Sequence, residues 1–110
     1  MTLSKYRILW MLVVFDIPVD STEGRREATK FRNVLLDNGF TMMQYSVYIR
    51  HTAGKEIFGK FVKIIKEYLP ECGDVSILEF TDKQYEKILS FSGKKKKDKN
   101  KGGVEQLTLF

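Results

Sequence analysis

An unbroken apolar run of eight residues, Ile8–Phe15, constrains this chain more than any other feature, and it ends at Asp16. A run without polar alternation is typical of a central β-strand covered on both faces. It is far shorter than the roughly 18 residues of a membrane span. No small-residue cleavage site of a signal peptide follows it. We therefore expect a core strand in a cytoplasmic protein that makes no membrane contact, and the single Cys72, which allows no intrachain disulfide, fits that compartment.

The rest of the domain alternates helical and extended patterns. Capping signals and amphipathic spacing predict helices over residues 20–38 and 54–69. Further strands are predicted over residues 40–51, 75–80 and 88–92, with a reversal near Gln44 to Ser46 and a helical turn capped by Thr81 and Gln84. This order favours an α+β ferredoxin-like βαββαβ sandwich with an extra C-terminal strand and both helices on one sheet face. Another body must then cover the bare face, and a second copy of the chain would do so.

Charge divides the chain into three parts. Residues 94–101 hold six lysines and one aspartate, so this run accounts for the whole net charge of +5. We expect a ferredoxin-like domain over residues 1–93, a basic flexible linker over 94–103 and a C-terminal docking strand over 104–110. In that strand the apolar side chains are those of Val104, Leu107, Leu109 and Phe110. The alternatives for this end are a frayed terminus and a strand that joins the sheet edge of a partner.

The sequence has few of the residues that common catalytic and metal sites require. The chain has one histidine, His51, and one cysteine. A Ser-His-Asp triad, a Cys-His pair and a multi-histidine metal site are therefore weak hypotheses, and no glycine-rich phosphate loop is present. We interpret His51 as a surface residue near a strand end.

Asp16 is the position that stands out, because it closes the central strand where α/β sheets commonly present ligand-binding groups. It is either a turn aspartate ahead of Pro18 or a ligand for a hard cation such as Mg²⁺, which prefers carboxylate oxygens. One carboxylate per chain is a poor metal site, but a twofold dimer that sets two Asp16 side chains face to face would double it. Asp20 is the alternative second carboxylate, although its position also suits a helix cap.

Four basic residues of the first predicted helix are candidates for nucleic-acid binding: Arg25, Arg26, Lys30 and Arg32. They could contact phosphates. Glu23, Glu27 and Asp37 partly neutralise them, so a solvated helix face is the alternative.

Motifs in three places resemble the CRISPR-associated Cas2 family: Phe15-Asp16-Ile17-Pro18 at the end of the first strand, Phe31-Arg32 with Gly39-Phe40 around the first helix, and Gln44-Tyr45-Ser46-Val47-Tyr48 in the extended stretch. The resemblance implies a symmetric homodimer with the bare sheet faces together. It implies a role in spacer acquisition, in which the dimer bridges the larger CRISPR integrase and supports foreign double-stranded DNA. It also implies Mg²⁺-dependent cleavage of single-stranded RNA or duplex DNA, with Asp16 as the metal-binding aspartate. Phe15 stands where many relatives carry tyrosine.

Two hypotheses follow from these observations. In the first, Asp16 from both subunits shares one Mg²⁺ and acts catalytically with Ser46, while Arg25 or Arg26 orients the nucleic-acid backbone. In the second, the protein is a scaffold that neutralises phosphates without reading bases and docks on the integrase through its last seven residues. We favour the scaffold as the biological role, with cleavage as a conditional activity. A stand-alone toxin-type endoribonuclease of the same fold is the remaining alternative.

Overall fold

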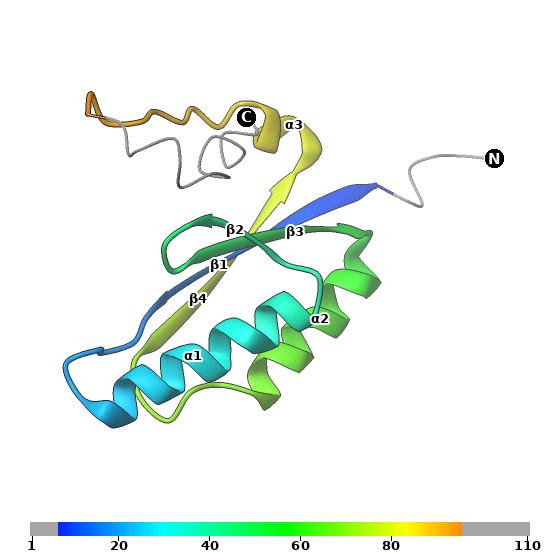
Figure 1. Cartoon of the computed structure of the whole chain (residues 1–110). Helices are drawn as coiled ribbons and strands as arrows, with labels where there is room; N and C mark the ends of the chain where they lie inside the picture. The colour runs from blue at the N-terminus through cyan, green and yellow to red at the C-terminus, as the bar shows by residue number, and fades with distance from the viewer. Residues whose placement is uncertain (1–6, 96–110) are drawn as a thin grey trace.

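A computed structural model describes residues 7–95 of the chain. Its elements, in chain order, are β1 (Ile8–Asp16), α1 (Thr22–Asp37), β2 (Thr41–Gln44), β3 (Val47–Ala53), α2 (Lys55–Glu67), β4 (Asp74–Thr81) and α3 (Asp82–Glu86). The strands form one antiparallel sheet in the order β2-β3-β1-β4, and α1 and α2 lie together on one face of it (Figure 1). The predicted α+β class and the ferredoxin-like order of the elements are therefore confirmed.

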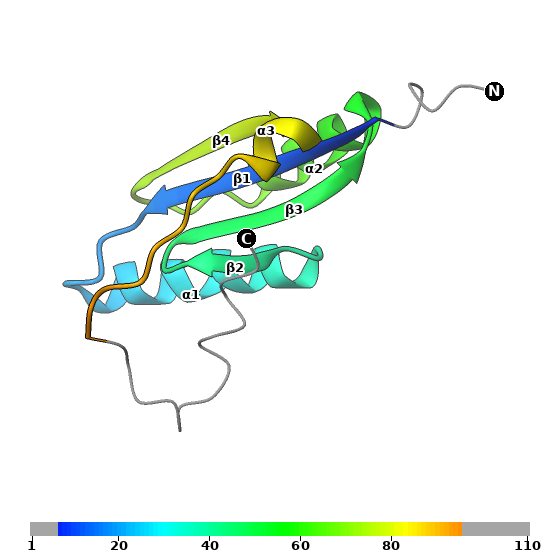
Figure 2. The same cartoon turned by 90° about the horizontal axis from the view of Figure 1, so that it is seen from above.

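β1 is a central strand, as predicted, with β3 on one side and β4 on the other (Figure 2). Its odd-numbered residues point to the helices, and Met11 and Val13 are completely buried. Its even-numbered residues point to the opposite face, where Ile8 and Val14 are more than one-third exposed. Within the single chain, α1 and α2 therefore cover only one face of the apolar run. The other face, which we call the bare face, keeps apolar side chains in contact with water.

In β3 the more polar side of the alternation faces the helices. Tyr48 and Arg50 alternate with the apolar Val47 and Ile49, and they point to the helices. Tyr48 is buried in the core, and the Arg50 guanidinium lies 4.1 Å from the centroid of the Phe61 ring. Arg50 also donates hydrogen bonds to the carbonyl oxygens of Asn38 and His51. Arg50, which is half-buried, therefore ties the end of α1 to β3 and α2 at the border of the core.

The ends of α1 are fixed by side-chain capping and by a glycine. Ser21 is the N-cap, and its hydroxyl accepts a hydrogen bond from the Gly24 N–H at 3.0 Å. The expectation that Asp20 caps this helix was wrong, because the helix begins one residue later and Asp20 remains exposed. Gly39 has φ of 84°, which favours glycine, and it ends the helix as predicted.

The chain crosses to the bare face after β4. Thr81 and Gln84 form the predicted capping box of α3. The Trp10 ring stacks on Tyr85 at 3.8 Å, and its indole N–H donates to Asp82 at 2.8 Å. Trp10 is an even-numbered residue of β1, so α3 lies on the bare face, opposite α1 and α2 (Figure 1).

The strand predicted over residues 88–92 does not form. The side chains of Leu89 and Phe91 are 80% and 86% exposed, so this segment has no apolar surface to pack against in the single chain. The predicted linker and docking strand, including Val104, Leu107, Leu109 and Phe110, lie outside the described residues apart from Lys94 and Lys95. Across residues 7–95, every helix is too short or too polar to cross a membrane.

Candidate functional site

A pocket of about 310 Å³ opens at the carboxyl end of β1. Its lining comes from the end of β1, the following loop, α1 and the turn between β2 and β3: Phe15, Asp16, Ile17, Val19, Ala28, Arg32, Tyr45 and Ser46. The structure thus brings together three of the predicted site residues, Asp16, Ser46 and Arg32. They come from three separate elements, and only the tertiary structure makes them neighbours.

Asp16 is the last residue of β1 and is exposed on the bare face. Its direct cross-strand partner is Asp74, the first residue of β4, so two carboxylates stand side by side at this edge of the sheet. Gly73 makes the approach possible: its φ is 91°, and a Cβ there would collide with the carbonyl oxygen of Asp16. The backbone therefore holds Asp74 close to Asp16.

Ser46 lies in the turn that joins β2 to β3, at the predicted reversal. It has φ of 65°, the only positive φ among the described non-glycine residues. Its carbonyl oxygen accepts a hydrogen bond from the N–H of Phe15 at 3.1 Å, which fixes the turn to the end of β1. A non-glycine residue in the left-handed region costs roughly 1–2 kcal/mol, so the surrounding structure maintains this conformation beside the pocket.

Arg32 supplies the positive charge of the pocket. Its guanidinium lies 5.9 Å from the centroid of the Tyr45 ring, within the range of a cation–π contact. Arg32 also acts on Tyr48: burial raises the pKa of the Tyr48 hydroxyl, and the positive charge and hydrogen bonding of Arg32 lower it by less, so the net pKa lies above its ordinary value. Arg32 thus interacts with two tyrosines, Tyr45 in the pocket wall and Tyr48 in the core.

The other basic residues of α1 are placed differently. Arg25 donates hydrogen bonds to the carbonyl oxygen of Val19 at 3.0 Å and to the Thr22 hydroxyl at 3.3 Å, so it braces the loop between β1 and α1. Arg26 is exposed on the same helix. Their contact with nucleic acid stays a prediction.

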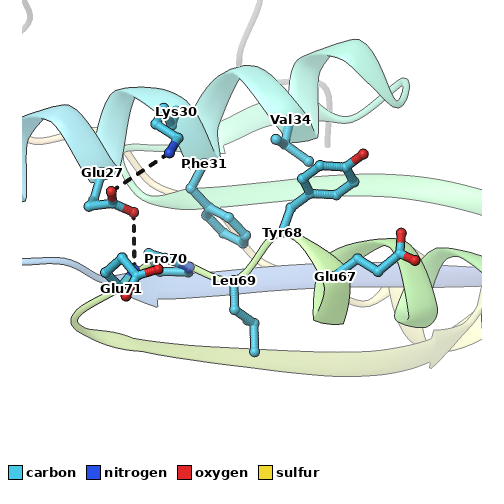
Figure 3. Close-up of a pocket in the computed structure, with 9 residues that line it drawn as sticks. All are labelled: Glu27, Lys30, Phe31, Val34, Glu67, Tyr68, Leu69, Pro70 and Glu71. Carbon is cyan, nitrogen blue, oxygen red and sulfur yellow. Dashed lines mark hydrogen bonds and ion pairs between the residues drawn. The ribbon is translucent and has the colours of Figure 1, made fainter.

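Lys30 lines a second pocket of about 220 Å³, on the side of α1 that faces the end of α2 (Figure 3). Its ammonium is 3.8 Å from a carboxylate oxygen of the buried Glu27. The other oxygen of Glu27 accepts a hydrogen bond from the Glu71 N–H at 3.0 Å, which ties the loop before β4 to α1. Lys30 is therefore separated from Asp16 and Arg32 by the helix that carries it.

The arrangement offers a hard cation two carboxylates per chain. Within residues 7–95, no three acidic, histidine or cysteine side chains are grouped closely enough to hold a metal ion. The oxygens of Asp16 and Asp74 are of the type that Mg²⁺ prefers, but a single chain supplies too few of them for a closed site.

Sequence reasoning missed two residues at this site. Asp74 immediately precedes a predicted strand, and pairing that strand antiparallel to Ile8–Phe15 would have placed it opposite Asp16. Tyr45 is an aromatic residue in the predicted reversal, where side chains are exposed, and this position is the signal that could have indicated it. Its side chain is 72% exposed.

The fold and the pocket together define a class of small ferredoxin-like α+β protein in which a central strand ends in a carboxylate beside an arginine. The family profile of "CRISPR associated protein Cas2" matches residues 9–88. The chain therefore belongs to this family, as its motifs indicated.

Three named relatives match most of the length of this chain. The chain is 43% identical over 108 residues to the "CRISPR-associated endoribonuclease Cas2" of Paracidovorax avenae, covering 98% of this chain and 99% of the relative. It is 43% identical over 108 residues to the protein of the same name from Flavobacterium psychrophilum, covering 98% and 93%. The Ligilactobacillus salivarius protein of that name is 41% identical over 88 residues, covering 80% and 87%. These matches favour the CRISPR-associated interpretation over a toxin-type ribonuclease.

Proposed function

We propose that the chain acts as a symmetric homodimer in CRISPR spacer acquisition, and that its paired Asp16 side chains form a site for Mg²⁺-dependent phosphodiester cleavage. The observation that carries this proposal is the position of Asp16 on the bare face. The same face exposes Ile8, Val14 and Leu78, each between 36% and 40% exposed. A second copy packed on this face buries their apolar surface and brings a second Asp16 to the interface.

The residues fit a metal site that is completed by the dimer. Asp16 and Asp74 of each subunit would hold the ion, and Mg²⁺ bound there would activate water and stabilise the charge of the reacting phosphate. Arg32 lines the same pocket and would offer the phosphate a cation, and Ser46 anchors the turn that forms part of the lining. The name endoribonuclease, which the relatives carry, supports cleavage of RNA as the activity.

The proposed cellular role is that of a cytoplasmic scaffold. The dimer bridges the larger CRISPR integrase, and Arg25, Arg26 and Arg32 support foreign double-stranded DNA through its phosphates. The last seven residues, 104–110, which follow the exposed Leu89 and Phe91 in the sequence, are proposed to add a strand to the integrase.

Cleavage is tested with Asp16→Asn. Wild-type protein with Mg²⁺ should cleave single-stranded RNA or duplex DNA, and the variant should lose cleavage while remaining a dimer in sedimentation. Asp20→Asn is the matched control, because Asp20 is an exposed acid of the adjacent loop and should leave the rate unchanged. Full activity in a rigorously purified Asp16→Asn sample would show that a contaminant cleaves the substrate.

Docking is tested by removing residues 104–110. The shortened protein should bind the integrase more weakly and still form the dimer. Unchanged affinity for the integrase would contradict the docking proposal. It would not affect the proposed dimer or the proposed metal site.

A further inference from the structure

Tyr45 presents an aromatic ring to solvent at the mouth of the Asp16 pocket. Its side chain is 72% exposed, whereas Tyr48, three residues later, is buried. Exposing most of a tyrosine ring gives up the free energy of its burial, which for a large apolar side chain is about 1.5–3 kcal/mol. The fold therefore holds this ring at the pocket with little stability gained from packing it.

The backbone that carries the ring is also held in position. The turn is attached to β1 through the hydrogen bond between the Phe15 N–H and the Ser46 carbonyl oxygen. The guanidinium of Arg32 lies over the ring, 5.9 Å from its centroid. An exposed ring on an anchored turn can stack without the cost of ordering the backbone that carries it.

The neighbours of Tyr45 fit a nucleotide. The ring and Arg32 line the same pocket as Asp16, so an aromatic face, a cation and the proposed metal-binding carboxylate are presented together. A nucleobase stacks on an aromatic ring whatever its identity, and the attached phosphate is attracted to the cation. Bases inside a duplex are already stacked and paired, so only an unpaired base can reach the ring.

We propose that Tyr45 is the residue that stacks an unpaired nucleobase next to the phosphate that lies at Asp16. The proposal rests on the proposed function, because it assumes that nucleic acid binds at this pocket. It assigns to Tyr45 the positioning of the substrate, through contact with a base.

The test measures binding without cleavage, in the absence of divalent cations. The probe is a short single-stranded oligoribonucleotide that carries 2-aminopurine, whose fluorescence is quenched when it stacks on an aromatic ring. Tyr45→Leu keeps the apolar volume but removes the aromatic face, and Tyr45→Phe keeps the face. Tyr68→Leu is the matched control, because Tyr68 is 56% exposed and lines the other pocket, across α1 (Figure 3).

Tyr45→Leu is expected to weaken single-strand binding about tenfold and to abolish the quenching. Tyr45→Phe and Tyr68→Leu should bind and quench like the wild type, and duplex affinity should stay the same in all four proteins. Wild-type binding and quenching by Tyr45→Leu would overturn the stacking proposal while leaving the proposed nuclease intact. Loss of the dimer in Tyr45→Leu would also overturn it, because the ring would then be a subunit contact. A wild-type protein that binds neither strand form would overturn the proposed function as well.

Discussion

The Asp16–Asp74 pair leads to a prediction about stability that is independent of any cleavage assay. The two residues are direct cross-strand partners at an exposed end of the sheet. Facing carboxylates about 6 Å apart in water repel each other by about 0.7 kcal/mol, which agrees with the roughly 0.2–1 kcal/mol found for cross-strand pairs. Asp16→Asn should therefore stabilise the metal-free protein by about 0.7 kcal/mol and raise Tm by about 3–6 °C.

The assay is thermal unfolding followed by circular dichroism in a chelating buffer. Asp74→Asn should give the same increase, and the double variant should gain no more than either single variant, because one substitution already removes the repulsion. The increase should shrink in about 1 M salt, where the Debye length is only about 3 Å. Asp20→Asn, an acid without a cross-strand partner, is the control. An unchanged or lower Tm for Asp16→Asn would refute the reasoning.

The result also bears on the functional test. If Asp16→Asn is more stable than the wild type and no longer cleaves nucleic acid, loss of activity cannot be attributed to unfolding. Sites that hold like charges together for function are expected to cost stability in this way.

Three further predictions concern the contacts that hold the domain together. Arg50→Lys should lower the free energy of unfolding by about 1–2 kcal/mol in urea titration, because one ammonium cannot replace both hydrogen bonds to the Asn38 and His51 carbonyl oxygens and also the contact with the Phe61 ring. An unchanged urea midpoint would contradict this role of Arg50. Gly73→Ala should destabilise the protein by at least about 1–2 kcal/mol in the same assay, because a residue with a Cβ is strained at φ of 91° and because this Cβ would collide with the carbonyl oxygen of Asp16. A Gly73→Ala variant as stable as the wild type would show that the turn can change its conformation. Burial raises the pKa of Tyr48 in the folded state, so the neutral Tyr48 hydroxyl contributes its full stability below the unfolded pKa of about 10, and this contribution is lost as pH rises through the folded pKa. The Tyr48→Phe variant has no hydroxyl to ionise, so above about pH 10 it should unfold less readily than the wild type. Identical alkaline unfolding curves for the two proteins would contradict this.

Much of the fold could be predicted from local patterns. The apolar run of β1, the glycine after α1 and the capping box of α3 each act within a few residues of the chain, and each lies where the sequence predicted. The expectations that were wrong concerned choices that depend on packing. Ser21 rather than Asp20 caps α1, and residues 88–92 form no strand because no apolar surface covers Leu89 and Phe91 in the single chain.

The sequence by itself determined the family, the ferredoxin-like order of elements and the importance of Asp16, because these depend on local motifs and on the period of apolar residues. Only the tertiary structure placed Asp74 opposite Asp16, brought Arg32 to the same pocket and turned Tyr48 inward while leaving Tyr45 in solvent. These placements depend on strand register and on the side of the helix that faces the sheet. A one-residue shift in register would send every one of these strand side chains to the other face, so no local pattern could decide them.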